Sequence, residues 1–82
     1  MNVETILEKL RGIFASELGL EKAEVDGSLQ YSMIPEWDSV GHMHLVAAIE
    51  EVFSIEIPDN DVAEMTTFNN VVDTVSRLVG DG

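Results

Sequence analysis

The 82-residue chain has no cysteine, only two prolines, only four basic residues and no long apolar run. Without cysteine it can form neither a disulfide nor a thiolate zinc site, so we expect a reducing, cytoplasmic setting. A membrane-spanning helix needs roughly 18 or more apolar residues in succession. The first residues also lack the basic character of a signal peptide. We therefore expect no insertion into a membrane.

The few basic residues are unevenly placed. They are Lys9, Arg11, Lys22 and Arg77, so residues 23–76 contain none, although eleven of the 16 acidic residues lie there. With a net charge of −12, such a surface repels nucleic acid and anionic lipid headgroups. It attracts proteins that carry basic patches and speeds their encounter. The charge pattern therefore excludes nucleic acid as a partner and favours proteins with basic docking patches.

Apolar periodicity predicts an all-α fold: a small four-helix bundle with a long first loop, formed by one domain over residues 1–82. Asn2 and Asp38 are the expected N-caps, and Gly19 is expected to end the first helix. The three long helices are expected at 3–18, at 39–53 and from 68 onward, with a short one between 59 and 65. Their expected apolar faces are Val3, Ile6, Leu7, Leu10, Ile13, Phe14 and Leu18; Val40, Met43, Val46, Ala47, Ile49 and Phe53; and Phe68, Val71, Val72, Val75, Leu78 and Val79.

Two connecting segments need separate treatment. Residues 53–57 alternate apolar and polar side chains as a strand does, but the chain offers no partner strand. We expect an extended connector that ends at Pro58. Residues 19–37 form an unusually long connection for so small a domain. Its scattered apolar residues predict that it packs over the bundle.

Ser39 is the most informative residue, because it is expected at the first position of the second helix. There it is exposed and lies at the positive end of the helix dipole, beside backbone amides that suit a phosphate. A nucleophilic role would need an oriented base and an oxyanion site. His42 lies three residues on, but the nucleophile elbow requires glycine two places before the serine, where Trp37 stands. We predict no catalytic residue, and we interpret His42 and His44 as surface residues.

One segment of the sequence is a candidate for binding a metal ion. Asp59-Asn60-Asp61 resembles the opening of a calcium-binding loop. The fifth and sixth positions would be Ala63 and Glu64, where such a loop needs an oxygen ligand and a glycine. We predict no metal site.

The remaining pattern is a family resemblance that covers essentially the whole chain. Its parts are Asp38-Ser39-Val40 with the helix through Phe53, then Ile57-Pro58-Asp59, then Thr66-Thr67 before the last helix. Together they resemble the acyl carrier protein family. The resemblance implies that a phosphopantetheinyl transferase attaches 4'-phosphopantetheine from coenzyme A to Ser39. It also implies a non-catalytic carrier that holds acyl or aminoacyl thioesters for partner enzymes of fatty-acid, polyketide, nonribosomal-peptide or related biosynthesis.

The same resemblance makes the second helix the docking face for partner enzymes. The docking residues that it implies are Asp38, Val40, Met43, Glu50, Glu51 and Glu56. Plainer interpretations stay open: Asp38 as an N-cap only, Glu50 and Glu51 as a solvated helix end, and Met43 as part of the core.

The chain also departs from the pattern of fatty-acid carriers. These commonly have acids where Gly41 and His44 stand, and Trp37 is more typical of carriers dedicated to one pathway. We expect such a specialised carrier, acting as a monomer. The alternative is a carrier-like protein-interaction module that bears no prosthetic arm.

Overall fold

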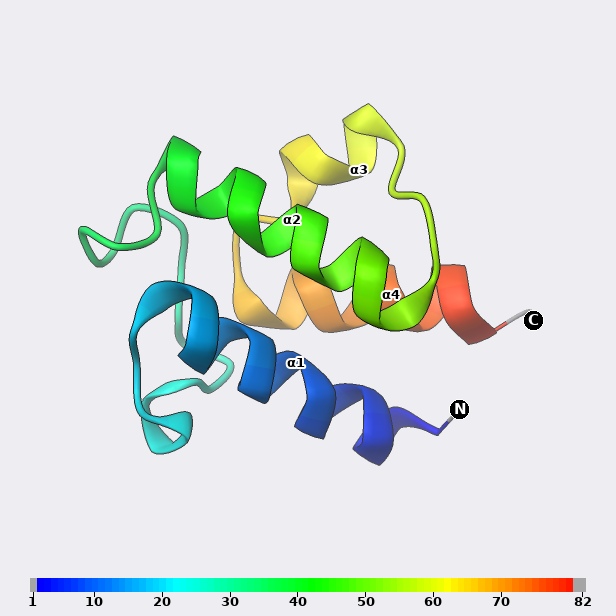
Figure 1. Ribbon diagram of the computed structural model, residues 1–82, viewed down its shortest axis with the longest axis horizontal. Coiled ribbons are helices and arrows are strands. Elements are labelled where there is room, and N and C mark those ends of the chain that lie inside the picture. The colour runs from blue at the N-terminus through cyan, green and yellow to red at the C-terminus, as the bar shows by residue number, and fades with distance from the viewer. Residues whose placement is uncertain (1, 81–82) are drawn as a thin grey trace.

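The computed structural model describes residues 2–80, which form helices and connecting segments without a strand (Figure 1). The predicted all-α fold with three long helices and a short one is confirmed. Within residues 2–80, the ladder-type pairing is limited to an isolated antiparallel bridge between Gln30 and Thr67. The elements are α1 (Val3–Leu18), a 3₁₀ turn η1 (Lys22–Glu24), α2 (Ser39–Phe53), α3 (Asp59–Glu64) and α4 (Phe68–Gly80).

Helix α1 begins and ends as its sequence predicts. The Asn2 side chain accepts a hydrogen bond from the Thr5 amide at 2.8 Å. Gly19 closes the helix with a φ of +68°, in the left-handed region that glycine adopts without strain. The face toward the core is also as expected, with one exception: Val3, the first residue of the helix, is exposed.

Helix α2 has the predicted bounds, but it buries a different face. Its core residues are Gly41, Leu45, Val46, Ile49 and Phe53. The expectation that Val40, Met43 and Ala47 are part of the buried face is wrong, since all three are exposed. The physical reason is that α2 is apolar on nearly every side. Periodicity alone therefore does not select which apolar stripe meets the core.

The C-terminal half follows its predicted course except at the end of α2. The expectation of an extended connector over residues 53–57 is wrong at its start, because the buried Phe53 side chain continues the core face of α2 and Ser54 closes that helix in the left-handed region, with a φ of 54°. Residues 55–58 lie outside any helix and bury Ile57. Helix α3 is short and has no fully buried side chain. Helix α4 begins after Thr67, whose Oγ1 accepts the Asn70 amide at 3.0 Å. Its predicted apolar stripe is buried or half-buried throughout.

The long segment between α1 and α2 lies against the bundle, as predicted. It buries Val25, Leu29 and Trp37. Its backbone is joined to the start of α4, because the Phe68 amide donates to the Leu29 carbonyl at 2.9 Å. This segment therefore completes the core and delivers the chain to α2.

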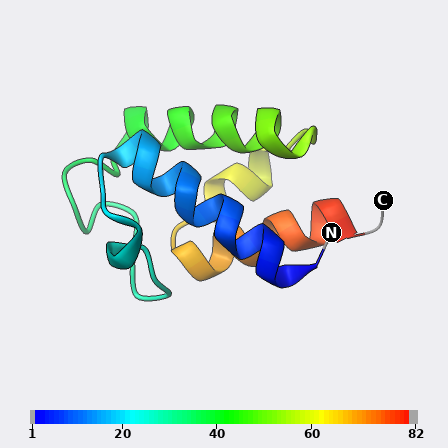
Figure 2. The ribbon, with the colours of Figure 1, turned by 60° about the horizontal axis from the view of Figure 1, so that its bottom comes forward.

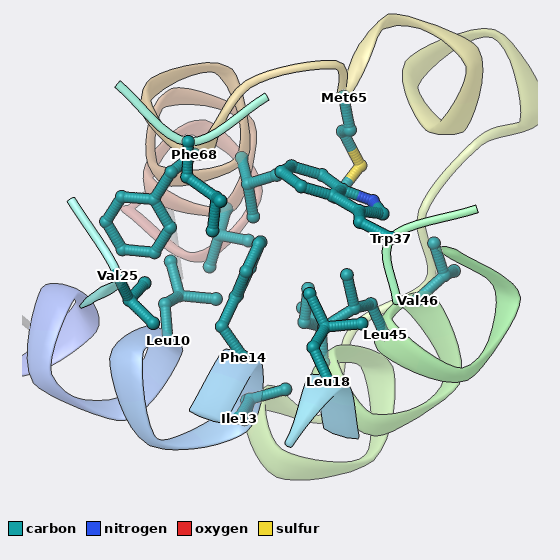
Figure 3. Packing of buried hydrophobic residues seen from close by; sticks show 14 of the residues in the cluster. Leu10, Ile13, Phe14, Leu18, Val25, Trp37, Leu45, Val46, Met65 and Phe68 are labelled. Carbon is teal, nitrogen blue, oxygen red and sulfur yellow. The ribbon is translucent and has the colours of Figure 1, made fainter. Parts of the chain in front are cut away.

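The ring of Phe14 lies in the middle of the core. The ring of Trp37 meets it edge-on (Figure 3). The Phe14 centroid is 5.1 Å from that of Trp37 and 5.0 Å from that of Phe68. Trp37 is completely buried. Edge-to-face contacts of this kind stabilise a core by about 0.5–1.5 kcal/mol each beyond the area that they bury. Trp37 is therefore a fixed point two residues before Ser39.

Candidate functional site

Ser39 is the first residue of α2, and its side chain is exposed. In both ribbon views, the start of α2 lies beside the long loop, at the end of the molecule opposite the first turn of α1 and the last turn of α4 (Figures 1 and 2). A group attached to Ser39 would therefore extend from this end of the bundle.

The helix start around Ser39 is held by Asp38. The Asp38 carboxylate accepts the Gly41 amide at 2.8 Å, and its carbonyl accepts the His42 amide at 2.8 Å. The predicted N-cap is confirmed. Amides in the first turn have no intrahelical carbonyl partner. Because the Gly41 amide is bonded to Asp38, the amides of Ser39 and Val40 remain to bind a group at the positive end of the helix dipole. They lie beside the serine hydroxyl, so this helix start suits a phosphodiester on that oxygen.

Gly41 is buried, and its small size is required by the backbone that passes over it. A Cβ at this position would collide with the carbonyl oxygen of Glu36 and lie 3.3 Å from Cδ2 of Leu18. Gly41 is therefore not part of the exposed face of α2. The glycine lies on the inner side of α2, where it lets the Glu36–Trp37 backbone approach the helix.

His42 is half-buried, so the interpretation of this residue as a surface histidine is also wrong. Its Nδ1 accepts the indole N–H of Trp37 at 3.0 Å, and its Nε2 lies 2.9 Å from the carbonyl oxygen of Val62. The ring of Tyr31 meets it edge-on at 5.6 Å. Both nitrogens are thus engaged, and neither is free to act as a base toward Ser39. His44, in contrast, is exposed, as predicted.

This geometry assigns the proton on the neutral His42 ring. Because the Trp37 indole can only donate, Nδ1 must be the bare acceptor. Nε2 then carries the hydrogen and donates it to the Val62 carbonyl. No signal in the sequence alone would have identified this pairing, since Val62 lies twenty residues away.

The implied docking residues fall into two groups along α2. Val40 and Met43 are 62% and 61% exposed, one turn or less from Ser39. Glu51 and Glu56 are exposed at the far end of the helix and on the connector after it. Glu50 is half-buried, and its carboxylate accepts the Ile57 amide at 2.9 Å. Glu50 therefore fastens the connector to α2, whatever else it contacts.

A pocket of about 560 Å³ opens between α2 and α3. Met43, Val46 and Met65 form part of its apolar lining, and His42 and Glu50 are among its polar residues. His42 and Glu50, whose side chains connect α2 to the α3 region, therefore also border the pocket.

Asp61, from the segment that resembled a calcium loop, pairs with Arg77 at 2.7 Å. Residues 2–80 contain no group of three or more His, Asp or Glu side chains that could hold a metal ion. The same residues include no helix long and apolar enough to cross a bilayer.

Comparison with known proteins agrees with this geometry. The family model described as phosphopantetheine attachment site matches residues 8–75. The chain is 35% identical to an acyl carrier protein of Guillardia theta over 79 residues, which cover 96% of this chain and 98% of the relative. It is 36% identical to an acyl carrier protein of Rubrobacter xylanophilus over 75 residues, which cover 92% of this chain and 93% of the relative. The chain therefore belongs to the acyl carrier protein family, whose prosthetic group is covalently attached 4'-phosphopantetheine.

Proposed function

We propose that Ser39 is the attachment point of 4'-phosphopantetheine and that residues 1–82 act as one carrier domain. The observation that carries this proposal is the placement of Ser39: an exposed hydroxyl on the first residue of a 15-residue helix, with Asp38 as its cap. The chain has no cysteine. The thiol that holds an acyl or aminoacyl group as a thioester is therefore supplied by the prosthetic group.

The residues around Ser39 support the attachment itself. A transferase would join the Ser39 oxygen to the phosphate of the phosphopantetheinyl group. The hydroxyl proton is lost, the pyrophosphate bond of coenzyme A is cleaved, and adenosine 3',5'-bisphosphate is the leaving group. The phosphodiester left on the serine carries a negative charge, which the helix dipole stabilises. Neither ring nitrogen of His42 is available for proton transfer at Ser39. The proton must therefore be taken by the transferase.

We further propose that partner enzymes dock on α2 through two sets of residues. Val40 and Met43 offer exposed apolar surface beside Ser39. The second set consists of the carboxylates of Asp38, Glu50, Glu51 and Glu56. Since residues 23–76 contain no basic residue, this side of the protein would steer partners with basic patches into contact.

The departures at Trp37 and His44 favour a carrier dedicated to one pathway over a general fatty-acid carrier. The burial of Gly41 adds to this: an acidic side chain there would meet the Glu36 carbonyl and displace the segment before Ser39. The biosynthetic class is fatty-acid, polyketide, nonribosomal-peptide or a related thioester pathway. We place the carrier in the cytoplasm, as a monomer that performs no chemistry of its own.

The test is intact mass after incubation with coenzyme A, magnesium and a phosphopantetheinyl transferase of broad specificity. We expect a mass gain of one phosphopantetheinyl group, which Ser39→Ala abolishes. Ser16→Ala is the matched control, since Ser16 is also an exposed serine on a long helix, and it should retain the gain. If several transferases give no gain, the carrier function is wrong and an interaction module without an arm takes its place.

A further inference from the structure

His42 joins two parts of the molecule that lie on opposite sides of its ring. On one side is Trp37, the buried residue two places before Ser39. On the other is Val62, in α3. We propose that His42 is a positioning residue, which holds α3 and the segment leading to Ser39 in fixed relation. The proposal rests on the proposed function only in taking Ser39 as the modified residue.

The first support is the small size of α3. It is six residues long and has no fully buried side chain, although Val62 packs against the core. The most extensive helix packing in the bundle is of α1 with α2 and with α4. Three side-chain hydrogen bonds hold α3 and the segment before it. The Ile57 amide donates to Glu50, Arg77 donates to Asp61, and His42 reaches the Val62 carbonyl. Of these, the His42 link is the one that contacts the C-terminal half of α3.

The second support is the geometry on the other side of the ring. The indole of Trp37 and the imidazole of His42 are inclined by only 21°, and their nitrogens are 3.0 Å apart. Trp37 is fully buried, and its other ring contacts are with Phe14 and Tyr31. A buried indole N–H without an acceptor is unfavourable, so the position of this ring depends on His42.

Trp37 is the single tryptophan of the chain, so its emission reports directly on this contact. We expect His42→Leu to shift the emission maximum at pH 7.5, because the indole N–H loses its acceptor. His44→Leu should leave the spectrum unchanged, because His44 is exposed and makes no contact with the indole in the hydrogen-bond and ring pairs of residues 2–80. An unaltered spectrum in folded His42→Leu would overturn the proposal.

A second measurement tests the link to α3. Amide hydrogen exchange at pH 7.5 should be roughly tenfold faster in α3 in His42→Leu than in the unmodified chain, as expected when one hydrogen bond to a locally stable segment is lost. Residues 37–41 should loosen together with α3, and His44→Leu should change neither. If His42→Leu does not fold, His42→Phe replaces it in both measurements. A phenyl ring has a similar shape but offers neither the acceptor for the indole N–H nor the donor for the Val62 carbonyl. Unchanged exchange in α3 of a folded variant would refute the role.

The functional readout is phosphopantetheinyl transfer to Ser39. We expect His42→Leu to raise KM for the carrier several-fold with kcat changed less than twofold, since the hydroxyl is intact and only its surroundings are loosened. A decrease in kcat as large as the rise in KM, in a folded variant, would contradict a positioning role. The Ser39→Ala mass experiment decides the proposed function by itself, so failure of either inference can be told apart.

Discussion

Gly41→Ala is the substitution for which helix propensity and tertiary packing make opposite predictions. In the interior of an exposed helix, alanine is favoured over glycine by about 1 kcal/mol. Gly41, however, is buried, and an added Cβ would collide with the carbonyl oxygen of Glu36 and lie 3.4 Å from the carbonyl carbon of that residue. The effect on stability depends on whether the backbone at Glu36 can move.

Two hydrogen bonds restrict that movement. The Trp37 amide donates to the Ile34 carbonyl at 3.2 Å, and the Trp37 carbonyl accepts the Ser32 amide at 2.8 Å. Displacing Glu36 would therefore displace the buried indole that follows it. Overpacking in a well-packed interior costs about 1–3 kcal/mol. Set against the gain of about 1 kcal/mol in propensity, this leaves a net loss of up to about 2 kcal/mol in the free energy of unfolding. Because the clash is with backbone and not with a flexible side chain, we expect the upper end of that range.

The assay is urea denaturation followed by circular dichroism at 222 nm, analysed by linear extrapolation. The matched control is Gly12→Ala in α1, where the atom nearest to an added Cβ is Cε of Lys22, at 3.9 Å. We expect the control to gain about 0.5–1 kcal/mol. The reasoning fails if Gly41→Ala is as stable as the unmodified chain, or if both substitutions shift the midpoint in the same direction.

Further predictions concern the polar contacts. Asp38→Ala should lower the free energy of unfolding by about 1 kcal/mol through loss of the cap, which urea denaturation would show. Glu50→Ala should cost about 1–3 kcal/mol because the Ile57 amide loses its acceptor. Glu50→Gln should retain most of the stability while removing the charge, so weaker partner binding by Glu50→Gln would separate a docking role from the structural one. Hydrogen bonds from the Ser28 side chain and amide lower the pKa of Asp26. A lowered folded-state pKa contributes stability above the unfolded-state pKa that is lost as pH falls through the folded-state pKa. Ser28→Ala should therefore raise the pKa of Asp26, as measured by NMR titration, and remove part of the stability that the lowered pKa contributes. An unchanged Asp26 pKa would contradict this assignment.

The bounds of the helices could be predicted from sequence because local chemistry determines them. Asn2, Asp38 and Gly19 act through neighbouring amides and their own backbone angles, which follow from residue type. The buried face of α2 could not be predicted in this way. Its apolar residues surround the helix, and only contact with α1 and the long loop selects Leu45 for the core and leaves Val40 and Met43 exposed. Exposure of these two is what their proposed docking role requires.

The candidate site shows the same division. Ser39 could be identified from sequence, because its position depends on the adjacent cap. The roles of Gly41 and His42 could not, because both depend on residues brought close by the fold. Treated one by one on a helical wheel, these residues look like departures from a carrier pattern.

Trp37, Gly41 and His42 are better understood as one packing arrangement. A buried indole directly before the cap of α2 needs its backbone close to the helix, and Gly41 provides the space. The indole N–H needs an acceptor inside the protein, and His42 provides it from the next position along the helix. Replacing any one of the three would leave the other two without the contact that explains them. Their effects on stability should therefore be non-additive, as expected of residues that share partners. The position of Ser39 follows from this arrangement, since only Asp38 separates it from the buried ring.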